Sequence, residues 1–407
     1  MFASGFQLLA SSFGILPNMS FDLYSDLQQR KQANLFRSTR VVQSPQGPHL
    51  TVDGQDYLAF CSNDYLGLAN HPKVIEAFKS AADQYGVGSG AAHLVNGHFE
   101  LHEKLENELA QWTSRESALL FSTGYMANMG VIASLTNKDD AVFEDKWNHA
   151  SLLDGGLLSG SRFQRYLHND LDNLESKLKK SEARRKLVVT DGVFSMDGDK
   201  ADLTALSTLA EQHDAWVMVD DAHGMAALGA TGAGLCQEQC VNQNQIQILM
   251  GTLGKGFGTA GAFVAGSKEL IEYLTNFARP YIYTTAMPPA ISAATLASLD
   301  IIKNEPQRRD HLNTLIQYFR NEVAGLGLTL MDSATAIQPI LVGDAEKALA
   351  MSHALREKGL MVTAIRPPTV PKDTARLRVT LSASHKMSDI DQLISGLHFA
   401  KQQVIQE

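Results

Sequence analysis

Five short apolar runs, each bounded by turn-forming residues, constrain the fold of this chain more than any other feature. They lie at residues 118–124, 186–192, 215–221, 246–252 and 260–266. Short continuous apolar runs of this kind are typical of strands buried on both faces of a sheet. Helix-length segments such as 203–213 lie between them. Strands that alternate with helices predict an α/β fold with a mostly parallel central sheet covered by helices.

The helical patterns and a change in the sequence pattern near residue 300 predict how the chain is divided into domains. Pro72 opens a helix that Gly86 ends, and the face expected to be buried consists of Val74, Ile75, Phe78, Ala81 and Ala82. A second helix is marked by Leu101, Leu105, Leu109 and Trp112. We expect an extension over 1–18, an N-terminal segment over 19–62 that packs with the small domain, a large domain over 63–300 and a small α+β C-terminal domain over 301–407.

Composition excludes several classes of protein. The net charge of −9 and the pI near 5.8 give no electrostatic footprint for nucleic acid. Three cysteines, without paired spacing, predict reduced thiols in the cytoplasm and no metal site. The leading residues lack a basic segment and an unbroken apolar run, so we expect neither a signal peptide nor a membrane span. They are interpreted as a disordered or mis-annotated extension, with Met19 as the natural start.

The residues that follow the apolar runs carry the chemistry, because ligands bind beyond the carboxyl ends of parallel strands. Residues 122–125, Ser-Thr-Gly-Tyr, precede a helical segment whose first amides are free to bind a phosphate. Asp220 and Asp221 end the run at 215–221, and His223 follows it. A buried carboxylate requires a cationic partner, although Asp221 has the ordinary alternative of capping a helix.

Lys255 lies among glycines in GTLGKGFG, residues 251–258. A Walker loop would require Gly at 249 and Ser or Thr at 256, where this chain has Leu249 and Gly256. The glycines at 256, 258 and 261 match G-x-G-x-x-G, but the residues after them read as a strand and not as the helix that a dinucleotide site needs. Both phosphate motifs therefore fail.

A lysine, an Asp-x-x-His group and phosphate-type donors together suit pyridoxal 5′-phosphate. Its aldehyde needs an amine, its pyridinium nitrogen needs a carboxylate, and its phosphate needs amides and hydroxyls. Taken singly, Lys255 has a bland interpretation as a surface lysine, and His149 and His223 as structural histidines. Their joint occurrence favours the cofactor.

A long series of ordered motifs then resembles the α-oxoamine synthases, a family of fold-type I pyridoxal-phosphate transferases. The resemblance runs from about Phe21 to the C-terminus. One departure is GSGAAH at 88–93, where many relatives carry a further Gly-Ser. The motifs are SNDYLGLANHP, GVGSGAAHLVNGH, STGYMAN, WNHASLLDG, HNDL, VFSMDGD, MVDDAHG, GTLGKGFG, IYTTAMPPA, AIQPILVGD and AIRPPTVPKDTARLRVTL.

The resemblance assigns roles to individual residues. It implies that Lys255 forms the Schiff base, that Asp220 pairs with the pyridinium nitrogen, and that His149 stacks on the ring. Contacts to the phenolic oxygen would come from Ser195 and His223, and contacts to the phosphate from Gly124, Tyr125 and Thr252, with Thr284 or Thr285 reaching in from the second subunit of a homodimer. Substrate contacts would come from Asn63 and Arg378, which grip the amino-acid carboxylate, and from Arg37 and Thr369, which meet the acyl substrate.

The implied reaction is the decarboxylative condensation of an amino acid with an acyl thioester. The motif wording favours L-alanine and a pimeloyl thioester, carried by coenzyme A or acyl carrier protein, as in biotin biosynthesis. Within the family, 2-amino-3-oxobutyrate CoA ligase and 5-aminolevulinate synthase remain alternatives. Outside it, a non-catalytic partner subunit and a nicotinamide oxidoreductase remain. Alternation places Arg376 and Arg378 on one face of a strand, so that only the resemblance selects Arg378.

Overall fold

The computed structural model describes residues 21–33 and 35–404. The extension expected over residues 1–18 lies outside the described residues. The chain divides into a unit that ends at Val42 and a unit that begins at Gln43. In the first unit, α1 (Leu23–Gln32) is capped by Asp22, whose side chain accepts a hydrogen bond from the Ser25 amide at 3.0 Å. Its side chains are not buried, so this helix has no core of its own.

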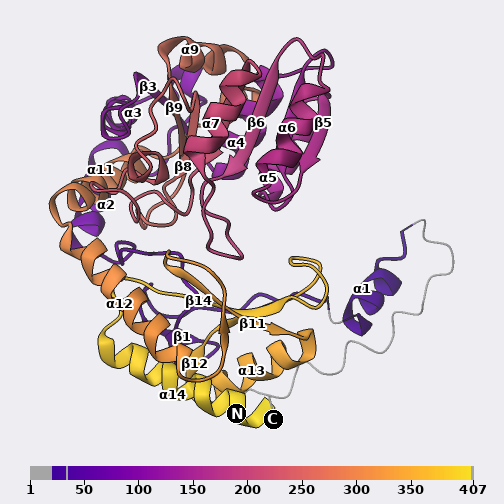
Figure 1. Cartoon of the computed structure of the whole chain (residues 1–407). Coiled ribbons are helices and arrows are strands. Elements are labelled where there is room, and N and C mark those ends of the chain that lie inside the picture. Colours follow the sequence, from indigo (N-terminus) through magenta and orange to yellow (C-terminus); the bar gives the residue numbers. More distant parts are fainter. Residues whose placement is uncertain (1–20, 34, 405–407) are drawn as a thin grey trace. The chain divides into compact units, whose positions relative to one another are not determined.

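The second unit contains a large sheet, to which the described residues contribute seven strands in the order β3-β9-β8-β7-β6-β4-β5 (Figure 1). Only β9 runs antiparallel to its neighbours there. The expectation of a mostly parallel sheet is therefore confirmed. The strands are β3 (Ser117–Phe121), β4 (Ala141–Asp145), β5 (Arg162–Tyr166), β6 (Lys186–Asp191), β7 (Ala215–Asp220), β8 (Ile248–Thr252) and β9 (Ala262–Gly266).

Both faces of this sheet are buried, as strands without alternation require. On β7, Val217 and Val219 belong to one apolar cluster, whereas Met218 between them belongs to another. Helices provide the second layer on each face. They are α3 (Glu100–Trp112), α6 (Leu171–Lys179) and α7 (Leu203–Gln212) on the side of Val217, and α4 (Gly124–Leu135), α5 (Ala150–Leu158), α9 (Lys268–Phe277) and α10 (Arg279–Ile282) on the side of Met218.

Two of the seven strands, β4 and β5, were not among the five predicted runs. Strand β4 reads AVFED, and its acidic residues Glu144 and Asp145 are buried, contrary to the usual pattern. Strand β5 reads RFQRY and forms the edge of the sheet, where polar side chains reach solvent. Hydrophobicity alone does not detect either strand.

The remaining strands form two small sheets in the described residues, one ordered β1-β2-β12 and the other β10-β11-β14-β13. A two-residue turn at Asp53 and Gly54, both with positive φ, joins β1 to β2. The strands are β1 (His49–Val52), β2 (Gln55–Ala59), β10 (Thr329–Leu330), β11 (Ile337–Gly343), β12 (Leu360–Met361), β13 (Thr363–Ile365) and β14 (Ala375–Thr380). The helices beside them are α12 (Gln307–Ala324), α13 (Ala345–Glu357) and α14 (Met387–Val404).

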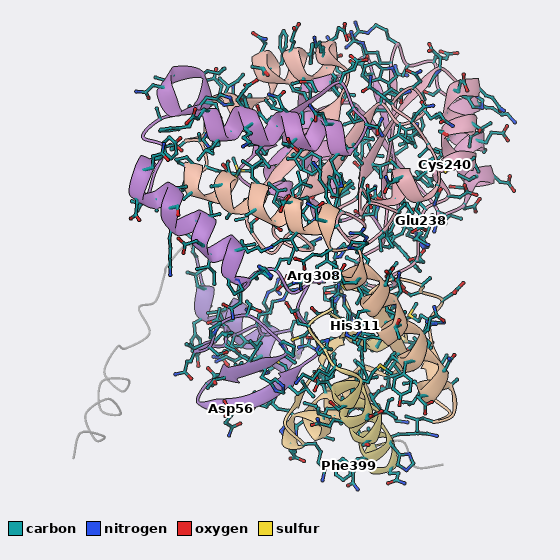
Figure 2. The ribbon with its side chains drawn as sticks, turned by 90° about the vertical axis from the view of Figure 1, so that its left-hand side faces the viewer. Asp56, Glu238, Cys240, Arg308, His311 and Phe399 are labelled. Carbon is teal, nitrogen blue, oxygen red and sulfur yellow. The ribbon has the colours of Figure 1, made fainter. Side chains whose placement is uncertain are left out.

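Strand β2 pairs in parallel with β12, so the segment near residue 60 is joined to the C-terminal part of the chain. Figure 2 shows Arg308 and His311 on α12 and Phe399 on α14. Arg308 donates to the Leu66 carbonyl at 3.4 Å, and Lys358 lies 4.1 Å from the centre of the Phe399 ring. The boundaries at residues 62 and 300 are retained as proposed domain boundaries.

The first predicted helix forms α2 (Pro72–Tyr85), with Pro72 at its start and Gly86 at its end in a positive-φ conformation. Its predicted buried face is only partly right. Val74 and Ala81 are buried, but Phe78 is 41% exposed. Helix α2 packs chiefly against α11 (Pro289–Asn304), so only a narrow stripe of it is covered. Among the described residues, no helix is long and apolar enough to cross a membrane.

Strand β14 contacts the loop that follows β6 through a buried ion pair. Arg376 is only 2% exposed and pairs with Asp197. The same guanidinium donates from Nε to the Thr374 carbonyl at 3.0 Å and from Nη2 to the Thr374 hydroxyl at 3.1 Å. Burial raises the pKa of Asp197, and the Arg376 charge opposes that increase. The pair therefore links the small sheet to the large one at the cost of two desolvated charges.

We expect Arg376→Ala to lower the free energy of unfolding by about 3 to 5 kcal/mol, because the Asp197 carboxylate would stay buried without its partner. Urea unfolding at neutral pH measures the change. The double variant Arg376→Ala with Asp197→Ala should regain part of the loss, since it removes the stranded charge. A double variant as unstable as the sum of the single changes would show that the two residues do not act as a pair.

Candidate active site

A cavity of about 190 Å³ lies at the carboxyl ends of the parallel strands. Residues from the segments that follow β3, β4, β6, β7 and β8 line it, as expected for an α/β sheet. Eight of its lining residues were predicted as site residues. The lining consists of Gly124, Tyr125, Asn128, His149, Ser151, Asp191, Ser195, Asp220, Ala222, His223, Met250, Thr252 and Lys255.

Lys255 follows β8 on a tight loop, and its glycines are required by close packing. A Cβ on Gly256 would lie 2.6 Å from the Met225 carbonyl oxygen, and one on Gly258 would lie 2.3 Å from the Ala69 amide nitrogen. The Lys255 Nζ atom lies 2.8 Å from His223 Nε2. Burial lowers the pKa of Lys255, and the carboxylates of Asp220 and Asp191 oppose that decrease. The amine is therefore easier to deprotonate than a surface lysine.

Asp220 ends β7 and is held in place by two donors. Its Oδ2 accepts a hydrogen bond from Asn128 Nδ2 at 2.7 Å, and its Oδ1 accepts one from the Ala222 amide at 3.0 Å. Asn128 Nδ2 also donates to the Ser151 hydroxyl at 2.9 Å. Asn128 Oδ1 is buried and has no hydrogen-bond partner within the described part of the chain.

Asp221 has a different job. It is fully buried, and its Oδ2 accepts a hydrogen bond at 2.6 Å from the Leu235 amide, at the start of α8 (Leu235–Glu238). Burial, with a smaller contribution from Asp220, raises the pKa of Asp221 to about 8. The capping alternative left open by the sequence therefore describes Asp221, while Asp220 faces the cavity.

Two histidines line the cavity, and each is held by different neighbouring residues. His223 Nδ1 hydrogen-bonds the Tyr65 hydroxyl, and burial together with the Lys255 charge lowers the pKa of His223 well below its ordinary value. His149 caps α5, and its Nδ1 lies 2.7 Å from the Ser151 hydroxyl. Its amide donates to Asp191 Oδ2 at 2.7 Å.

The start of α4 provides amides at the cavity. Thr123 caps the helix by accepting a hydrogen bond from the Met126 amide, while Gly124 and Tyr125 occupy the first helical positions, where a helix leaves amides without intrahelical partners. Helix N-termini of this kind bind phosphate. Thr252, at the end of β8, lies beside them and donates its hydroxyl to the Gly261 carbonyl at 3.1 Å.

Arg378 reaches the cavity's rim from β14. Its Nε donates to the Ser195 carbonyl at 2.6 Å, and its Nη2 lies 3.3 Å from Asn63 Oδ1. In residues 21–33 and 35–404, Arg378 has no carboxylate within ion-pair distance, whereas Arg376 pairs with Asp197. The geometry thus separates two arginines that the sequence could not.

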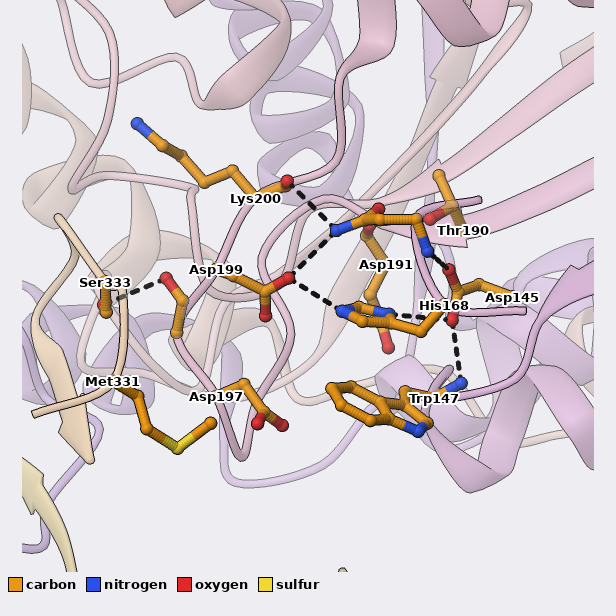
Figure 3. A network of polar contacts seen from close by, with 12 residues as sticks. Asp145, Trp147, His168, Thr190, Asp191, Asp197, Asp199, Lys200, Met331 and Ser333 are labelled. Atoms are coloured by element: carbon orange, nitrogen blue, oxygen red, sulfur yellow. Dashed lines mark hydrogen bonds and ion pairs between the residues drawn. The ribbon is translucent and has the colours of Figure 1, made fainter. Parts of the chain in front are cut away.

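Behind the cavity, an ion-pair network ties together the loops that follow β4, β5 and β6 (Figure 3). His168 lies between two carboxylates, at 3.1 Å from Asp145 and 2.8 Å from Asp199, and stacks on Trp147 with ring centres 4.0 Å apart. Burial alone would lower the pKa of His168, but the two hydrogen bonds raise it to about 9. The network fixes the loops that carry His149 and Ser195.

Six predicted residues do not line this cavity. Two of them, Asn63 and Arg378, lie 3.3 Å apart beside it. The other four are Arg37, Thr284, Thr285 and Thr369. Thr369 is exposed and its amide bonds the Arg366 carbonyl at 3.1 Å, while Thr285 forms an isolated bridge with Ala92, next to Thr284. Arg37 is exposed in the first unit. The roles predicted for these four residues stay predictions.

Sequence reasoning missed several residues that build the cavity. Asn128 and Ser151 lie in the quoted motifs STGYMAN and WNHASLLDG, but their roles emerge only from the faces of α4 and α5. Asp191 ends β6 opposite Asp220 on β7. A carboxylate at the end of each of two neighbouring parallel strands was the available signal for Asp191. Tyr65 lies in the quoted motif SNDYLGLANHP, but nothing in the sequence pointed to its contact with His223.

Comparisons with known proteins agree with this architecture. The sequence profile described as aminotransferase class I and II matches residues 55–397. An 8-amino-7-oxononanoate synthase of Pseudomonas syringae is 59% identical over 379 residues, which is 93% of this chain and 96% of the relative. The enzyme of that name from Cellvibrio japonicus is 58% identical over 375 residues, 92% of this chain and 94% of its own.

Solved structures give the same picture. Serine palmitoyltransferase of Sphingomonas wittichii superposes with a TM-score of 0.89 at 30% identity, covering 94% of this chain and 98% of its own. The 8-amino-7-oxononanoate synthase of Francisella tularensis gives a TM-score of 0.75 at 30% identity, with coverages of 86% and 98%.

The fold and the lysine-centred cavity define a fold-type I pyridoxal-phosphate enzyme, so the predicted fold class is confirmed. Within that class, the chain belongs to the 8-amino-7-oxononanoate synthases of the aminotransferase class I and II family.

The pKa of Asp221 yields a test of its structural role. An acid whose folded-state pKa exceeds its unfolded value binds more protons when folded, so the stability of the protein falls as pH rises from about 4 to about 8. Asp221→Asn keeps an oxygen for the Leu235 amide but cannot ionise. We therefore expect the melting temperature of Asp221→Asn, relative to wild type, to rise across this pH range.

Thermal melts at several pH values measure this difference. A difference in melting temperature that stays constant between pH 4 and pH 8 would show that ionisation of Asp221 does not destabilise the fold. The matched variant Asp220→Asn separates the two aspartates, because its defect should appear in activity.

Proposed function

We propose that this chain condenses L-alanine with a pimeloyl thioester, releasing the thiol and carbon dioxide, to give 8-amino-7-oxononanoate in biotin biosynthesis. The observation that carries the proposal is one cavity with the Lys255 amine, the Asp220 carboxylate and the first amides of α4 around it. Relatives with the name of this activity, at 58–59% identity over more than nine-tenths of the chain, support the substrate choice.

The residues present fit pyridoxal 5′-phosphate. Its three polar attachment points match an amine at Lys255, a carboxylate at Asp220 and a helix N-terminus at Gly124, all of which line the cavity. His149 supplies a flat ring to the lining, Ser195 supplies a further polar side chain, and His223 contacts Lys255. When bound, the cofactor supplies an electron-withdrawing ring that stabilises negative charge at the substrate Cα.

Lys255 has two tasks in this proposal. Its amine would hold the cofactor and, when free, would remove the proton from the alanine Cα. Burial lowers the pKa of Lys255, so a larger share of the amine is unprotonated near neutral pH and able to accept that proton. His223 Nε2, at 2.8 Å, orients the Nζ atom. After carbon dioxide is lost, the same amine returns a proton to the carbon.

In this proposal the Asp220 carboxylate would hold a proton on the ring nitrogen, and two donors fix its position. Asn128 and the Ala222 amide both donate to its carboxylate. Asp191, its neighbour on β6, has a pKa raised well above the ordinary value, by burial first and then by the Asp220 charge. The charge on Asp220 therefore disfavours ionisation of Asp191, because two adjacent carboxylates do not both ionise readily.

Arg378 and Asn63 are proposed to bind the amino-acid carboxylate. Arg378 has a planar fork of donors, and no described carboxylate neutralises it. Arg37 and Thr369 are proposed to contact the acyl chain or its carrier. The carrier is coenzyme A or acyl carrier protein.

The quaternary and cellular proposals rest on the same family. We propose a homodimer in which Thr284 or Thr285 of one subunit contacts the cofactor phosphate of the other. The cytoplasm is proposed as the compartment because the chain has only three cysteines.

The central test is Lys255→Ala assayed with L-alanine and pimeloyl-CoA. We expect turnover to fall by at least about a hundredfold, because the proton-transfer group is lost. The purified wild type should show a visible absorption band that borohydride removes, and the variant should not. Lys79→Ala, at an exposed lysine of α2, is the control. Condensation at the wild-type rate in Lys255→Ala would overturn the proposal.

Arg378→Ala tests substrate recognition. A charge-assisted hydrogen bond contributes about 1.5 to 3 kcal/mol, which corresponds to an increase of roughly tenfold to a hundredfold in the KM for alanine. The absorption band should not change. Arg378→Lys should be intermediate, because it keeps the charge and loses the fork. If Arg376→Ala raised this KM and Arg378→Ala did not, the carboxylate site would lie two residues away.

A further inference from the structure

A second cluster of ionisable side chains lies at the start of α3, and none of its members lines the cofactor cavity. His98 precedes the helix, and Glu103 and Glu106 lie one turn apart on the same helical face. His98 Nε2 is 3.3 Å from Glu103 Oε2 and 3.8 Å from Glu106 Oε2. The possible ligand atoms of these three residues all lie within 4.8 Å of one another.

These separations match those of a metal site. With metal–ligand distances of about 2.1 Å, the edge of a tetrahedron is about 3.4 Å, so the nitrogen and the two oxygens can bind one ion with little movement. Imidazole with carboxylates suits divalent ions such as Zn²⁺. The fourth position would be open to water, because the Glu103 side chain is 65% exposed.

The surroundings of Glu106 give a second, independent reason to expect a bound cation. It is only 8% exposed, and its Oε1 accepts a hydrogen bond from the Leu120 amide at 2.9 Å. Its Oε2 faces His98 and has no hydrogen bond from any residue of the described chain. A buried carboxylate without a lysine or arginine is costly, and a bound cation would offset that cost.

The other nitrogen of His98 is also placed as a metal-binding histidine requires. His98 Nδ1 lies 2.8 Å from His93 Nδ1, so His93 can accept the Nδ1 proton and leave the Nε2 lone pair directed at the carboxylates. His93 is fixed by stacking on Tyr281, with ring centres 5.0 Å apart. It begins a short turn, His93–Gly97, that is interrupted by the non-helical backbone of Asn96 (φ −150°, ψ 18°).

His102 lies close by but is not available as a ligand. Its Nδ1 accepts a hydrogen bond from the Phe99 amide at 3.0 Å, and its Nε2 contacts the Met287 carbonyl at 2.8 Å. Both nitrogens are therefore occupied by the backbone. The alternative set of three histidines would require one of these hydrogen bonds to break.

We propose that His98, Glu103 and Glu106 form a binding site for a divalent transition-metal ion, represented by Zn²⁺, with His93 as the residue that orients His98. The site ties the turn at His93–Gly97 to α3. This site is separate from the cofactor cavity. If it binds a metal ion, the expectation of no metal site that was drawn from the sequence is wrong.

The test uses the full-length protein with its cofactor bound, titrated with Zn²⁺ by isothermal calorimetry, with metal content measured after dialysis. We expect stoichiometric binding that His98→Gln and Glu103→Gln each weaken by at least about tenfold, a loss of the size seen for metal-site residues. Glu103 is exposed, so Glu103→Gln should fold even if His98→Gln does not.

His353→Gln is the matched control, because His353 lies 3.4 Å from Glu357 on α13 in an exposed pair without a second carboxylate. It should bind Zn²⁺ like the wild type. The proposal is overturned if the wild type takes up no Zn²⁺, or if all variants bind it equally. Equal binding together with a change in the cofactor absorption band would place the ion in the cofactor cavity instead.

Discussion

The opposed charges of the half-buried Lys255, just beyond β8, and the buried Asp220, at the end of β7, are the constraint on which the rest of the site depends. Burial lowers the pKa of the amine, and the carboxylate limits that decrease. Both residues come from neighbouring parallel strands of the large sheet. The register of these two strands therefore sets how the amine and the carboxylate are placed. Asn128 and the Ala222 amide then direct the Asp220 carboxylate into the cavity.

The small sheet completes the site through one strand. On β14, Arg376 and Arg378 share a face, and both reach the loop between β6 and α7, but their partners differ. Arg376 is neutralised by Asp197, whereas Arg378 meets only the Ser195 carbonyl and other neutral oxygens. One arginine thus joins the two parts of the fold, and the other has no carboxylate partner among the described residues.

Much of the fold could be read from the sequence because parallel strands are apolar on both faces. The prediction failed for β4, whose Glu144 and Asp145 are buried, and for β5, which is a polar edge. Burial raises the pKa of Glu144 to about 8, so this carboxyl is largely neutral where a hydrophobic residue would be expected. Propensity and hydrophobicity cannot detect a strand whose acids are accommodated by tertiary contacts.

Site residues that follow an apolar strand could be predicted from the sequence. Site residues whose position depends on the face of a helix or on a distant loop could not. Lys255, Asp220 and His223 follow apolar runs directly. Asn128 was missed because the face of α4 that meets Asp220 is fixed only by packing. The choice between Asp220 and Asp221 required the Leu235 amide, which binds Asp221 and excludes it from the cavity.

The network around His168 also depends on contacts between distant loops. The pKa of His168, about 9, keeps a cation between Asp145 and Asp199 at neutral pH. That cation holds three loops in one arrangement, so His149 and Ser195 are positioned before any ligand arrives.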